Sequence, residues 1–268
     1  LHDALPILGV WIGVACVVFG GLYTPFAAAA AVFLLAGIVP VLVWPKEPSS
    51  EEQPHTAMSA HMLMERFRAP RRAVEFWKAF ASRSLVSAGV GLTTMFLWFI
   101  ASALIFRDWF TQGNSSPIAV PVCSLIASMA LATLVGSVGA AFIAGPVGEY
   151  IEDPRYLSVI SCVLYTVALA LPMTMPSAVS MVLFALIGGF AFGLIDTFGQ
   201  LLAMGALPDA RSAGHDLAFF NLSNSVGLAL AAIIGAVGVA VTGGFSVLFP
   251  AAIVCVLASA VVTISMKR

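Results

Sequence analysis

Eight long apolar segments, separated by short polar stretches, limit what this chain can fold into. Each is close to the roughly 20 residues that a helix needs to cross a bilayer. With ends placed to about four residues, they are 5–22, 24–44, 84–106, 117–144, 156–175, 178–205, 217–242 and 245–265. In lipid, only helices and closed barrels satisfy their backbone hydrogen bonds, and these segments are too long and uniformly apolar for barrel strands. The sequence therefore predicts an all-α transmembrane bundle of eight spans.

The composition supports a membrane protein. Hydrophobic residues make up 60% of the 268 residues and charged residues 9%, whereas a soluble domain carries about 25% charged residues. A net charge of -1 gives no support to nucleic-acid binding. The four cysteines lie within apolar runs, at spacings that fit neither a zinc site nor a disulfide framework. We expect lipid as a partner, and no nucleic acid, metal or cofactor.

The basic residues orient the bundle. If the loops alternate from a cytoplasmic start, all of the 12 Lys and Arg residues except Arg107 fall on the cytoplasmic side. This positive-inside bias supports an even number of spans and places both ends of the chain in the cytoplasm. The long loop at 45–83 begins with a Pro-, Ser- and Glu-rich stretch that favours disorder. Residues 55–68 follow, and we leave open whether they form an interfacial helix or a solvated loop.

Three stretches carry a family resemblance. APRRAVEFWKAFASRSLVSAG (69–89), GFAFGLIDTFGQLLAMGALPDARSAGHDLAFFN (189–221) and, more weakly, GPVGEYIEDPR (145–155) resemble conserved parts of the major facilitator superfamily of transporters. In the third stretch Gly145 and Glu149 fit the superfamily's tight loop, but its basic half is absent. The resemblance extends to a branch that includes proton-coupled disaccharide symporters.

The resemblance implies how the chain is divided. Residues 8–44 would be the last two helices of the N-terminal half, 45–83 the cytoplasmic inter-half loop, and 84–268 the complete six-helix C-terminal half. Residues 1–7, LHDALPI, resemble the translation of an adapter used in DNA library preparation. We therefore expect these seven residues to be non-native and the chain to be a fragment that does not transport by itself.

The implied function is secondary active transport across the cytoplasmic membrane. The protein would be a monomer when full length, and would move a small polar solute, with sugars as the analogy, coupled to protons or sodium by alternating access. An integral membrane enzyme would need a cluster of ionisable groups at membrane depth, and the expected spans hold a single deep carboxylate. A transporter-like protein with a sensor or scaffold role remains the alternative.

The deep carboxylate is Asp196, about 13 Å inside the span that ends near 205. Ionisable residues inside a span indicate function by default, so we place Asp196 on the substrate or coupling-ion pathway. Gln200 follows at i+4 and shares its helix face. The family resembled carries its aspartate three residues later, where this chain has Gly199. A structural aspartate bonded to a neighbouring helix is the alternative.

Further polar and aromatic residues complete the candidate site. Asn221 and Asn224 share a face of the next span and would line the pathway or serve as gate or packing contacts. Trp98 would stack on a sugar ring or face lipid. At the cytoplasmic ends, Arg83 and Asp216 would pair across a gate or simply be solvated, and Glu149 is the remaining gate candidate.

Overall fold

The computed structural model describes four stretches of the chain, namely residues 74–108, 118–150, 153–206 and 213–266, together with a few helical positions near the N-terminus. The chain divides into two compact units, Leu1–Arg68 and Ala69–Arg268. The described residues of the first unit are helical and fall within the segment expected at 24–44; they are Ala27, Ala30, Ala31, Leu34 and Leu35. The segment expected at 5–22 and residues 1–7 lie outside the described residues.

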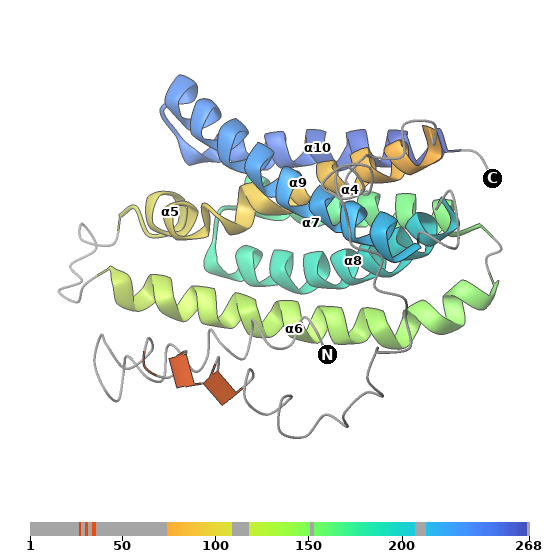
Figure 1. Ribbon diagram of the computed structural model, residues 1–268. Helices are drawn as coiled ribbons and strands as arrows, with labels where there is room; N and C mark the ends of the chain where they lie inside the picture. Colours follow the sequence, from red (N-terminus) through yellow and green to blue (C-terminus); the bar gives the residue numbers. More distant parts are fainter. Residues whose placement is uncertain are drawn as a thin grey trace. The chain divides into compact units, whose positions relative to one another are not determined.

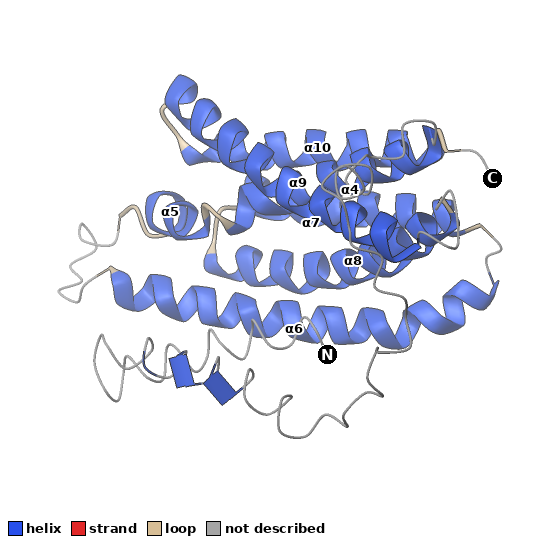
Figure 2. Cartoon of the chain, viewed as in Figure 1, coloured by secondary structure: helices blue, strands red, loops and turns tan. Residues whose placement is uncertain are grey.

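The described part of the second unit consists of helices and the turns between them (Figures 1 and 2). The long helices are α4 (Val74–Thr94), α6 (Ala119–Tyr150), α7 (Pro154–Thr174), α8 (Ala178–Gly205), α9 (Ala213–Thr242) and α10 (Leu248–Ile264). The short ones are α5 (Leu97–Ile100), the π-helix η2 (Ala101–Ile105) and the 3-10 helix η3 (Phe245–Val247). The predicted all-α class is confirmed for these residues.

Within the described residues, five helices are long and apolar enough to cross a membrane, and a sixth span is obtained if the bent pair of α4 and α5–η2 counts as one. These six correspond in order to the six segments expected between 84 and 268. The two parts of the bent pair meet at 45°. A multi-pass helical membrane protein is therefore confirmed, while the total of eight spans stays a prediction.

Two helices extend beyond the predicted spans. The first begins at Val74 rather than near residue 84, because Phe76 and Phe80 pack against Phe219 of α9, with ring centroids 6.3 and 5.8 Å apart. The second, α6, continues to Tyr150 instead of ending near residue 144, so Gly145 and Glu149 lie in its last turns. The tight-loop role expected for Gly145 is therefore wrong. Hydropathy marks the apolar part of a helix, and polar turns beyond it leave no such signal.

The helices pack in a symmetric order. Helix α8 packs on α6 and α7, α4 packs on α9 and α10, and α7 packs on α10. Figure 1 shows α6 and α8 side by side, with α10 on the opposite side of the bundle. Exchanging α4 with α8, α6 with α9 and α7 with α10 maps the α7–α10 pair onto itself and each of the other four pairs onto another of the four.

Small residues bring the helices into close contact. At the α6–α8 crossing, a Cβ added to Gly189 would lie 2.6 Å from the carbonyl oxygen of Thr133, and Ser137 Oγ donates to the Gly189 carbonyl at 3.2 Å. At the α4–α9 crossing, a Cβ on Gly227 would overlap the carbonyl of Ser84. Such contacts drive helix association in lipid, where apolar burial gives little advantage. They fix the register in which α6 meets α8 and α4 meets α9.

Candidate functional site

An ion pair joins α4 to α8. Nη2 of Arg83 contacts Oδ1 of Asp196, and both side chains are mostly buried, with 18% and 24% of their surface exposed. Gln200 Nε2 donates to Oδ2 of the same carboxylate at 3.0 Å. Both carboxylate oxygens of Asp196 thus accept from nitrogen donors, one of them cationic. The predicted polar stripe of Asp196 and Gln200 is confirmed, and Arg83 is its partner on the neighbouring helix.

The ion pair lies in the interior of both helices rather than at their ends. Asp196 precedes the end of α8 at Gly205 by about 13 Å of helix, at about 1.5 Å per residue. Arg83 lies at a similar distance from the start of α4 at Val74. An arginine side chain keeps its proton in proteins. Neutralising Asp196 would therefore remove the charge attraction within the pair.

The two asparagines of α9, Asn221 and Asn224, have different surroundings. Asn224 Oδ1 accepts a hydrogen bond from Ser87 Oγ of α4 at 2.8 Å. Asn224 thus makes a packing contact between α9 and α4, which was one of the alternatives for this residue. Asn221 is exposed on the surface of the described unit. A role for either in binding solute stays a prediction.

The aromatic candidate lies on the short helix after the bend. Trp98 of α5 has 40% of its surface exposed, while its neighbour Phe99 stacks on Phe245, with centroids 5.4 Å apart and rings 8° from parallel. The Phe99 stack ties the outer part of the bent span to the turn between α9 and α10. Sugar stacking on Trp98 stays a prediction.

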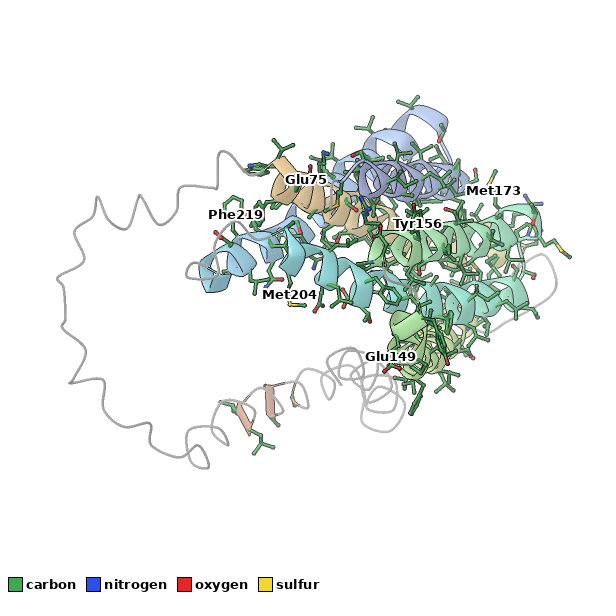
Figure 3. All side chains as sticks on the ribbon, turned by 90° about the vertical axis from the view of Figure 1, so that its right-hand side faces the viewer. Glu75, Glu149, Tyr156, Met173, Met204 and Phe219 are labelled. Atoms are coloured by element: carbon green, nitrogen blue, oxygen red, sulfur yellow. The ribbon has the colours of Figure 1, made fainter. Side chains whose placement is uncertain are left out.

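The three gate candidates lie on different helices. Arg83 pairs with Asp196 of α8, whereas Asp216, 4% exposed, lies in the first turn of α9. Glu149 is exposed in the last turn of α6, and Figure 3 shows it well separated from Glu75 of α4 at this end of the bundle. A gate contact between Arg83 and Asp216 and a gate role for Glu149 stay predictions.

Two cationic side chains at this end of the bundle make structural contacts that were not predicted from the sequence. Arg155 of α7 pairs with Asp153 at 2.5 Å and donates to the carbonyl of Met266, while Lys78 of α4 donates to the carbonyl of Ser265 at 2.5 Å. Cations near the last carbonyls of a helix bond them and complement the helix dipole. The sequence Asp-Pro-Arg was the available signal, since Asp and Pro favour the N-cap and N1 positions.

A cluster of hydroxyl groups joins α4 to α10. Ser82 Oγ lies 2.8 Å from both Ser259 Oγ and Thr263 Oγ1, and Ser259 Oγ also donates to the backbone carbonyl of Ser82 at 2.9 Å. Ser82 precedes the ion-paired Arg83 in the chain. The middle of α4 is thus held by polar contacts on two sides, to α8 through the ion pair and to α10 through hydroxyl groups.

The described residues contain no group of three or more His, Cys, Asp and Glu side chains arranged to hold a metal ion. The candidate site consists of the Arg83–Asp196–Gln200 cluster and the polar residues of α9 around Asn224.

No family model, no curated protein and no solved structure matches this chain.

Proposed function

We propose that this chain is part of a secondary active transporter of the major facilitator type, which moves a small polar solute, with sugars as the first class to test, across the cytoplasmic membrane. Transport is coupled to protons or sodium and proceeds by alternating access. The observation that carries the proposal is the pair of Arg83 and Asp196, held between two apolar helices.

The ion pair supports transport because charge inside a membrane is costly. Inserting one charged side chain at the centre of a span costs about 2.5–3.5 kcal/mol, so such residues are rare and usually line ion or substrate pathways. Removing one partner leaves the other without compensation in an apolar setting. A pair of this kind changes its energy greatly when Asp196 gains a proton, which gives a transporter a means to couple ion binding to helix movement.

The packing symmetry is a second support. Transporters of this class are built from repeats, with sites near the interface between them. Exchange of the first three spans with the last three preserves the helix pairs that pack together in this chain. The Arg83–Asp196 pair joins the first helix of one set, α4, to the first helix of the other, α8.

The bend in the first span is a third support. Helix α4 ends at Thr94, and the chain continues at 45° through α5 into the π-helical turn of Ala101–Ile105. Interrupted spans are common in transporters and π-helical turns are frequent at functional sites. Helix α4 thus carries the ion pair near its middle and is followed by a break after Thr94.

The alternative is a transporter-like protein that serves as a sensor or scaffold. The favouring observation is that Asp196 already accepts from both Arg83 and Gln200, an arrangement that is also suited to a static link between α4 and α8. The two functions differ in whether solute moves.

The test is solute-driven ion movement in proteoliposomes that contain the intact protein and are loaded with a pH-sensitive dye. A panel of mono- and disaccharides is added, with and without a sodium gradient. A saturable solute-dependent pH change, or saturable uptake that depends on the sodium gradient, supports transport, and Asp196→Asn should abolish the coupled signal. Saturable accumulation of a solute by Asp196→Asn at the wild-type level would remove the ion pair from the coupling pathway and contradict the proposal.

A further inference from the structure

A small cavity adjoins the ion pair. It lies between α4, α7, α8 and α9, close to the end of α10, and its lining includes Ser82, Arg83, Ser158, Gly199, Phe220 and Met266. The volume open to the centre of a water molecule is about 20 Å³. About 10–15 Å³ on this measure is enough for one water, provided that the site also offers polar partners.

Arg83 lines this cavity, and its second guanidinium nitrogen is a buried donor. While Nη2 contacts Asp196, the Nη1 atom is buried and has no hydrogen-bond partner among the described residues. A Cβ added to Gly199, which also lines the cavity, would lie 4.0 Å from Nη1. A buried donor of a charged group left without a partner is costly, so native proteins satisfy such groups with protein atoms or ordered water.

Two hydroxyl groups provide the other partners. Ser82 and Ser158 both line the cavity, and Ser158 has only 4% of its surface exposed. Ser82 also lies 2.8 Å from Ser259 Oγ and from Thr263 Oγ1 of α10. A molecule in the cavity would therefore have a cationic donor on one side and hydroxyl groups on the other, in keeping with the two to four partners that enclosed waters usually have.

We propose that this cavity binds one ordered water, held by Nη1 of Arg83 and by the hydroxyl groups of Ser82 and Ser158. The water gives the guanidinium a second anchor besides Asp196 and extends the ion pair into the hydroxyl cluster on α10. With this water in place, Arg83 keeps its position next to α7 and the end of α10 when Asp196 is neutralised. This site stands on the cavity and the buried nitrogen alone and does not depend on transport.

The direct test is a structure of the full chain in lipid nanodiscs, at a resolution that shows enclosed waters. We expect density for one water at a hydrogen-bond distance of about 2.7–3.2 Å from Nη1 of Arg83. An empty cavity in a map that shows other enclosed waters would overturn the proposal. Nη1 bonded to a protein atom in its place would overturn it as well.

A pair of glycine substitutions tests the water independently. Gly199→Ala places a methyl group between α8 and Nη1 and displaces the water, whereas a Cβ at Gly205, at the end of the same helix, would meet nothing within 4 Å. Gly199→Ala also gains helix propensity in the interior of α8, which opposes the expected loss, whereas Gly205 is the last residue of the helix. We expect the melting temperature of Gly199→Ala to fall about 2–4 °C below that of Gly205→Ala. Equal melting temperatures for the two variants would overturn the proposal, because displacing the water would then have no effect on stability.

Discussion

A Cβ on Gly199 would lie 4.0 Å from Nη1 of Arg83, on the side of the guanidinium that does not contact Asp196. The same arginine can therefore be reached from two positions on α8, which are separated by one helical turn. Positions i and i+3 share a helix face, so a carboxylate at either place has a route to the cation.

This geometry predicts that the carboxylate can be moved by one turn. Asp196→Ala should lower the free energy of unfolding by about 1–2 kcal/mol, a value reduced for the partial exposure of the pair. Adding Gly199→Asp to that variant should restore much of the loss, as measured by thermal melting in detergent. Asp196→Ala with Gly205→Asp is the matched control, because position 205 lies at the far end of α8. Equal recovery in both double variants would contradict a specific contact with Arg83.

The second prediction concerns coupling. In the intact protein, Asp196→Asn should leave expression and folding close to wild type but impair uphill solute accumulation, because the amide neither carries the charge nor exchanges a proton. Exchange of solute between equal pools should be reduced less than uphill uptake. The measurement is radiolabelled uptake and counterflow in the same vesicles. Normal uphill accumulation would make Asp196 a structural residue.

The third prediction concerns the contact between α6 and α8. Gly136→Ala should destabilise the protein by about 1–3 kcal/mol, because its Cβ would overlap the carbonyl of Leu186 and lie 2.7 Å from the backbone nitrogen of Phe190. Gly145→Ala, farther along α6, is the control, since its Cβ would meet nothing within 4 Å. Thermal melting of the two variants measures the difference. Equal stability would indicate that the helices approach less closely than described.

The fourth prediction is the topology. Single cysteines introduced at Ala60 and Ser212 in a cysteine-free background should react from the cytoplasmic side, and one at Gly113 from the outside, as the distribution of Lys and Arg residues requires. The measurement is labelling of intact cells by a membrane-impermeant maleimide before and after permeabilisation. Labelling of positions 60 and 113 from the same side would contradict the eight-span arrangement.

The sequence alone determined the class of protein and the place of six spans, because the length and apolarity needed to cross a bilayer are local properties. It also determined that Asp196 and Gln200 share a face, since a spacing of four residues fixes this in any helix. The early start of α4 was not visible, because the contacts of Phe76 and Phe80 with Phe219 join distant parts of the chain.

Only the tertiary structure decided which carboxylate meets Arg83. From the sequence, an ion pair of Arg83 with Asp216 and solvation of both side chains were equally good interpretations. The fold brings Asp196 to the guanidinium instead. Helix faces in soluble proteins are read from alternating apolar and polar sides, but a span in lipid is apolar all round. The face that α8 turns toward α6, and with it the face left for α4, is set by close glycine and hydroxyl contacts such as that of Ser137 with Gly189. These contacts depend on how the helices cross rather than on any local pattern.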